Sequence, residues 1–62
     1  MTWDAQAVRQ LRRHMGMSQQ ELAKHLGVRQ QTVSDWEIGK HQIQRHLQRM
    51  LSMVGEQVGF QT

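Results

Sequence analysis

The 62 residues of the chain are enough for one small domain with a limited hydrophobic core, so we expect residues 1–62 to form a single domain. No cysteine is present, which excludes disulfides and thiolate metal sites, and the formal net charge of +3 fits a polyanionic partner and ordinary solubility equally well. Because no apolar run approaches the ~20 residues of a membrane span and no signal peptide is visible, we expect a cytoplasmic protein without a membrane partner.

Two helices are predicted in the first half of the chain, each with apolar residues at helical spacing and a glycine after its last turn. The first is expected over about residues 4–15, with Thr2 or Asp4 as its N-cap. The second begins at Ser18, which forms a capping box with the glutamate three residues later, and ends about eight residues on at Gly27. A helix this short is unstable alone in water, so it must pack against its neighbours.

Two further helices are predicted in the second half. The third is expected over about residues 30–38, where a glycine again follows the last turn. The fourth is expected over about residues 43–54, whose apolar residues recur at helical spacing, and Gly55 is expected to interrupt it. Residues 56–62 show no pattern that predicts a structure. The fold class that follows is all-α.

A very short turn, residues 27–29, joins the second and third helices. Ala23 allows two steeply crossing helices to approach closely, and Gly27 adopts without strain the positive φ that a sharp turn needs. Three apolar residues are expected to hold the crossing angle from inside: Val28, Val33 and Trp36. The pattern, over about residues 19–38, predicts a helix-turn-helix motif, whose second helix lies in the major groove of DNA.

Two stretches that include this motif, residues 18–28 and 32–40, resemble the Cro/cI repressor-like family, also called XRE. The resemblance extends over about residues 8–54. It implies a small λ-repressor-like domain of four to five helices that binds DNA, usually as a dimer on a palindromic operator. The segment after Lys40 departs from the family because it lacks the usual proline, and the region of the fifth helix is reduced to residues 56–62.

The resemblance also implies which side chains contact DNA. Four residues of the third helix would face base edges: Gln30, Gln31, Thr32 and Asp35. Gln19 and Lys40 would lie beside phosphates. Arg29 stands where the family has a small hydroxyl N-cap, and it either weakens that cap or places a cation on a phosphate or a guanine.

The residue types on the third helix independently indicate the same DNA-contacting face. Four polar residues lie opposite the apolar side of that helix: Gln30, Gln31, Ser34 and Asp35. Glutamine can pair with N6 and N7 of adenine, and aspartate can accept from N4 of cytosine, although phosphates repel it. The alternative interpretation is an ordinary solvated helix face.

Arg12 and Glu37 each border an apolar helix face, one turn after a valine. We expect them to form a structural ion pair across the core, as in the relatives that the chain resembles. Arg9 and Arg13 lie elsewhere on the first helix and are expected to be solvated rather than bound to phosphate.

An enzyme or a metalloprotein is not indicated. The four histidines include no pair at four-residue spacing on one helix, and no serine lies in a glycine-flanked nucleophile elbow. A phosphate-binding glycine loop and an acid–base pair of carboxylates are also missing. We therefore expect no catalytic residues, no metal, no cofactor and no small-molecule substrate.

The function predicted from the sequence is that of a transcriptional regulator, specifically a repressor, which binds double-stranded DNA. A homodimer through the fourth helix and the tail is expected, with four apolar residues that alternatively cover the monomer's own core: Met53, Val54, Val58 and Phe60. Rival functions of the same fold are a DNA-binding antitoxin and a protein-interaction adaptor. No sensing domain is visible, so we expect control through abundance or a partner.

Overall fold

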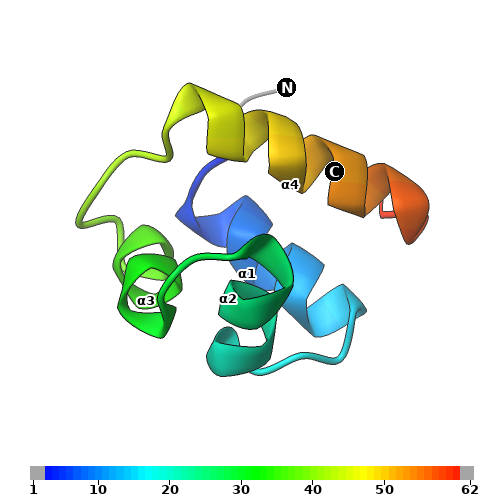
Figure 1. The fold of residues 1–62 in the computed structure, drawn as a ribbon, viewed down its shortest axis with the longest axis horizontal. Coiled ribbons are helices and arrows are strands. Elements are labelled where there is room, and N and C mark those ends of the chain that lie inside the picture. Colours follow the sequence, from blue (N-terminus) through cyan, green and yellow to red (C-terminus); the bar gives the residue numbers. More distant parts are fainter. Residues whose placement is uncertain (1–2, 61–62) are drawn as a thin grey trace.

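The computed structural model describes residues 3–60, which fold into four α-helices without any strand in that range. The helices are α1 (Ala5–His14), α2 (Gln19–Leu26), α3 (Gln30–Glu37) and α4 (Arg45–Gln57). In Figure 1, α4 runs across the top of the molecule and α1 lies between it and the α2–α3 pair. The predicted all-α helix-turn-helix fold is confirmed. No helix in this part of the chain has both the length and the apolar character needed to cross a membrane.

Side chains cap the first two helices. Asp4 caps α1, where its Oδ1 accepts a hydrogen bond of 2.8 Å from the backbone N–H of Ala7. Thr2, the other expected cap, lies outside the described residues. Ser18 and Glu21 form the predicted capping box of α2, in which each side chain accepts from the backbone N–H of the other. The hydrogen bond from the Ser18 backbone holds the pKa of the Glu21 carboxyl below its usual range.

The corner between α2 and α3 is a Schellman turn around Gly27, which has a φ of +75°. The N–H of Gly27 donates to the carbonyl of Lys24, and the N–H of Val28 donates to the carbonyl of Ala23 at 2.9 Å. Ala23 is buried at the point where the two helices pack, and Val28 packs on the edge of the core. The turn therefore satisfies the last carbonyls of α2 while it redirects the chain into α3.

The core is continuous through the domain. It includes residues of all four helices and of the segments that precede α1 and α4. Its buried residues are Trp3, Val8, Leu11, Leu22, Ala23, Leu26, Val33, Trp36, Ile43, Leu47, Leu51 and Val54. Within residues 3–60, no buried side-chain nitrogen or oxygen lacks a hydrogen-bond partner. The packing therefore places α3 in a fixed orientation without an unsatisfied polar group behind it.

The start of α4 lies two residues later than expected. Ile43 follows the apolar period of the helix, but it is buried in the extended segment before Arg45, the first helical residue. The side chain of Gln48, in the first turn of α4, donates to the carbonyl of Ile43 at 3.0 Å. This hydrogen bond ties the extended segment to the start of the helix. Ile43 matches the spacing because a residue just before a helix can pack on the same face as its first turn.

The prediction that Gly55 interrupts α4 is wrong, because the helix continues to Gln57. Gly55 is buried beneath two aromatic rings: a Cβ at this position would lie 3.6 Å from Trp3 and 3.7 Å from Phe60. These distances are ordinary van der Waals contacts, so the two rings pack directly over the backbone of α4 at this residue. Gly55 is therefore a buried helical residue and does not terminate the helix.

Trp3 and Phe60 join the two ends of the described chain over α4. Their rings stack with centroids 6.0 Å apart, and Nε1 of Trp3 donates to Oγ of Ser52 at 2.8 Å. His14 adds a second contact, since its Nε2 donates to the carbonyl of Val58 at 2.9 Å. The tail therefore covers the monomer's own core, at least as far as residue 60.

The conformation of Gly27 predicts how the corner responds to substitution. A Cβ there would meet no atom within 4 Å, so Gly27→Ala changes only the backbone energy of a left-handed residue. We expect Gly27→Ala to destabilise the domain by about 1 kcal/mol, which lowers the midpoint of thermal unfolding by about 4–8 °C in circular dichroism. Gly27→Asn is the control and should lose less stability than Gly27→Ala, because asparagine tolerates the left-handed conformation better. Equal midpoints for all three proteins would contradict the turn.

Candidate nucleic-acid interface

The helix α3 has one buried side and one polar side. Val33 is fully buried and Trp36 is 3% exposed, so this side is fixed in the core. Gln30 and Gln31 are exposed at the start of the helix, and Ser34 is half-buried one turn further on. The polar side chains therefore project from a rigid element and present amide donors and acceptors to the solvent.

Asp35 is largely covered, with a side chain that is 14% exposed. Its Oδ1 accepts a hydrogen bond of 2.9 Å from Nε2 of Gln31, one turn earlier. Its Oδ2 lies 3.8 Å from Nε2 of His41, in the connection between α3 and α4. Thr32 is half-buried beside them and lines the same small cavity of about 170 Å³.

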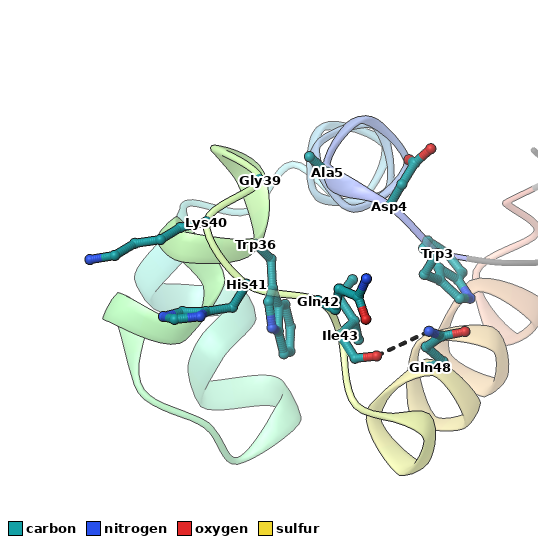
Figure 2. Close-up of a pocket in the computed structure, with 10 residues that line it drawn as sticks. All are labelled: Trp3, Asp4, Ala5, Trp36, Gly39, Lys40, His41, Gln42, Ile43 and Gln48. Atoms are coloured by element: carbon teal, nitrogen blue, oxygen red, sulfur yellow. Dashed lines mark hydrogen bonds between the residues drawn. The ribbon is translucent and has the colours of Figure 1, made fainter.

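A cation stands at each end of α3. Arg29 is the N-cap residue, and its exposed side chain makes no capping hydrogen bond to the described residues. At the other end, Gly39 has a φ of +74°, and the N–H of Lys40 donates to the carbonyl of Asp35 at 2.9 Å. This Schellman turn fixes the backbone of Lys40, whose exposed side chain points away from the fold (Figure 2).

Glu37, the last residue of α3, is 4% exposed and accepts hydrogen bonds from two other helices. Arg12 of α1 makes a bidentate pair with it, through Nε at 2.8 Å and Nη2 at 3.0 Å. Gln19 of α2 donates to the same carboxylate at 3.3 Å, and Arg9 of α1 donates to the backbone carbonyl of Glu37 at 2.6 Å. The structure therefore brings together Arg12 and Glu37, the residues predicted to form an ion pair.

These contacts also set the ionisation of the pair. Burial alone raises the pKa of the Glu37 carboxyl, but the hydrogen bonds from Arg12 and Gln19 and the charges of Arg12 and Arg9 outweigh it, so the pKa lies below its usual range. The hydrogen bond to Glu37 raises the pKa of Arg12 in turn. Both groups are therefore charged in the folded protein at neutral pH.

Two side chains make contacts that the sequence does not predict. Arg9, expected to be solvated, donates to the backbone carbonyl of Glu37, while 42% of its side chain stays exposed. Its position three residues before Arg12 on one helix face is a signal that could have revealed this contact. Gln19, predicted at a phosphate, donates one amide N–H to Glu37 and does not use its second N–H in this bond. The contact of His41 with Asp35 has no signal in the sequence, since nothing in the spacing of the connection places the two residues side by side.

A larger cavity of about 440 Å³ lies between the N-terminal segment, the α3–α4 connection and α4 (Figure 2). Trp3, Trp36 and Ile43 line its apolar part, and Asp4 and Lys40 stand at its rim with their side chains pointing away. No group of three or more potential metal ligands occurs within residues 3–60.

Comparison with known proteins adds the family. A family model described as helix-turn-helix, of the Cro/cI or XRE type, matches residues 8–52, which is most of the chain. No curated protein and no solved structure gives a significant match. The matched range begins within α1, includes all of α2 and α3, and ends within α4.

The contacts of Glu37 predict an acid-dependent contribution to stability. Because its pKa is lowered on folding, this contribution is complete above the unfolded value of about 4.3 and disappears as the pH falls through the folded value. Glu37→Gln should cost about 2 kcal/mol at neutral pH, and the gap to the wild type should narrow between about pH 5 and pH 3 in urea unfolding.

The matched control for this prediction is Glu56→Gln, which neutralises an exposed glutamate of α4. It should keep the acid dependence of the wild type. A gap between Glu37→Gln and the wild type that stays constant with pH would show that the ionised carboxylate contributes nothing.

Proposed function

Because the chain belongs to the Cro/cI type of the helix-turn-helix family, whose domains are DNA-binding regulators, we propose that it recognises specific double-stranded sequences and represses transcription. In this proposal α3 enters the major groove and the protein occupies an operator. DNA as the partner also assigns the protein to the cytoplasm. The observation that carries the proposal is the rigid packing of α3, which leaves Gln30 and Gln31 exposed on its free side.

Direct reading of bases is assigned to four residues of α3: Gln30, Gln31, Thr32 and Asp35. The two glutamines are exposed and stand in the first turn, the part of a recognition helix that reaches deepest into the groove. A glutamine that pairs with N6 and N7 of adenine discriminates by about 1–3 kcal/mol against other bases. Specificity therefore depends mainly on Gln30 and Gln31.

Phosphate contacts are assigned to the ends of the helices. The helix α3 contains no lysine or arginine, so attraction to the DNA backbone must come from its flanks. Arg29 immediately before α3 and Lys40 just after its C-terminal end are the exposed cations at those flanks. Gln19 retains one amide N–H at the start of α2 for a third phosphate.

A homodimer on a palindromic operator is the proposed assembly. The largest extent of the domain is 26 Å, less than the ~34 Å between successive turns of the groove on one side of the duplex, so one copy covers one half-site. The face of α4 that leaves apolar side chains exposed offers a contact: Met50, Met53 and Val58. Val54 and Phe60, also expected there, pack in the monomer instead.

The same exposed face favours the second candidate function, an antitoxin or adaptor of this fold. Met53 is 62% exposed, and a partner protein would cover it as well as a second copy would. Salt-dependent binding to duplex DNA separates the adaptor from the other candidates: a repressor and a DNA-binding antitoxin both show such binding, and a pure adaptor lacks it.

Selection from a random duplex pool tests the proposed function. We expect the wild type to enrich a two-fold symmetric sequence with half-sites about 10 base pairs apart, and Gln30→Ala to enrich a sequence that differs at one position in each half-site. The selected sequence should change because the variant loses one base-contacting side chain in the groove while its fold stays intact. The control is Gln20→Ala, which shortens an exposed glutamine of α2 and should leave the sequence unchanged. If Gln30→Ala returned the wild-type sequence, the assignment of the reading face would be wrong.

Lys40 predicts a uniform effect on affinity. Lys40→Ala should weaken binding to specific and unrelated duplexes by a similar factor and reduce the slope of log Kd against log salt by about one unit, because one phosphate contact is lost. Fluorescence anisotropy at several salt concentrations measures the slope. Lys24→Ala removes the chain's other lysine, exposed in the last turn of α2, and should leave the slope unaltered. An unchanged slope for Lys40→Ala would remove this residue from the phosphate contacts.

A further inference from the structure

Asp35 occupies the middle of a short chain of polar groups on the free side of α3. Its Oδ1 accepts from Gln31 at 2.9 Å, and its Oδ2 faces His41 at 3.8 Å. Only 14% of its side chain is exposed, against 65% for His41. One carboxylate oxygen therefore accepts a hydrogen bond, the other lies near the ring of His41, and little of the group is open to a base edge.

The chemistry of the pair determines the orientation of the Gln31 amide. An ionised carboxylate only accepts hydrogen bonds, so Gln31 must turn its NH2 group, and not its carbonyl oxygen, toward Asp35. One N–H is used in this bond. The second N–H and Oε1 remain free, and they are the donor and the acceptor that N7 and N6 of adenine require.

Gln30 provides the comparison. It carries the same amide at the start of the same helix, but its side chain has no hydrogen-bond partner among residues 3–60. Its amide can therefore rotate between both orientations, whereas that of Gln31 is held in one. The two adjacent glutamines therefore differ in preorganisation: the amide of Gln31 is already held in one orientation before it meets a base edge, and that of Gln30 is not.

We propose that Asp35 is a positioning residue for Gln31: it fixes the amide in the orientation that recognises adenine and does not read a base pair itself. This inference rests on the proposed function, since it assigns the way in which α3 distinguishes bases. It replaces a direct contact of Asp35 with cytosine by an indirect effect at the base pair that Gln31 faces. The negative charge of Asp35 weakens binding to all DNA and is retained because it sharpens the choice of base.

A double-mutant cycle on base discrimination tests the proposal. For Gln31→Ala, Asp35→Ala and the double variant, Kd is measured on the selected operator and on every single-base substitution of one half-site. We expect the wild type to prefer adenine at one base pair by about 5- to 150-fold. Both single variants should lose most of this preference at that same base pair, and the double variant should lose no more. Binding of Asp35→Ala to unrelated DNA should be as tight as that of the wild type or tighter.

Asp35→Asn is the conservative variant in this cycle. Asparagine can still accept from Gln31 but can also donate, so it permits both amide orientations, and we expect an intermediate preference. A change of preference at a different base pair, with factors that multiply in the double variant, would show that Asp35 reads its own base. Unchanged preferences in Asp35→Ala would equally overturn the proposal.

A measurement on the free protein separates this inference from the proposed function. The side-chain NH2 order parameter of Gln31, measured by NMR, should exceed that of Gln30 and fall to the same level in Asp35→Ala. A wild type that orders Gln31 in this way but shows no base preference would refute sequence-specific reading. Equal order parameters for Gln30 and Gln31 in the wild type would refute the positioning, whatever the DNA measurements show.

Discussion

The buried carboxylate of Glu37 is the constraint on which the orientation of α3 depends. It accepts from Arg12 of α1 and from Gln19 of α2, and its backbone carbonyl accepts from Arg9. Removing one partner of such a group leaves an uncompensated charge in the core, so the three helices can separate only at a high cost. Burial of Val33 and Trp36 fixes one side of α3, and the bidentate pair of Glu37 with Arg12 adds a contact of defined geometry at the end of the helix.

This arrangement separates the charges that serve the fold from those that serve the interface. Arg12 is directed inward to Glu37, and Arg9 bonds to the carbonyl of Glu37 while 42% of its side chain stays exposed. The helix α3 begins with two neutral amides and carries a hydrogen-bonded carboxylate at Asp35. In the proposed complex, Arg29 and Lys40 at the ends of α3 would attract the DNA backbone, and the neutral amides would discriminate between bases.

The sequence predicted those parts of the molecule that local rules determine. Helix caps at Ser18 and the turn at Gly27 follow from residue chemistry within a few positions, and the fold class follows from the apolar periods. The prediction at Gly55 is wrong because a glycine that ends a helix and one buried within it look alike in a sequence, and only the tertiary structure, with Trp3 and Phe60 packed over this residue, distinguishes them. The contact of His41 with Asp35 joins a connection to a helix, which no period encodes.

The closure of the two chain ends over α4 limits what a dimer can use. Because Phe60 stacks on Trp3 and Val54 is buried, the apolar contact proposed for a second copy is reduced to Met50, Met53 and Val58. Three partly exposed side chains bury much less than the ~1,200 Å² of a stable interface, so the dimer should be weak in free solution. In the proposed complex, two half-sites on one duplex would hold the copies at a high effective concentration, so operator symmetry would contribute more to dimerisation than the contact between the proteins.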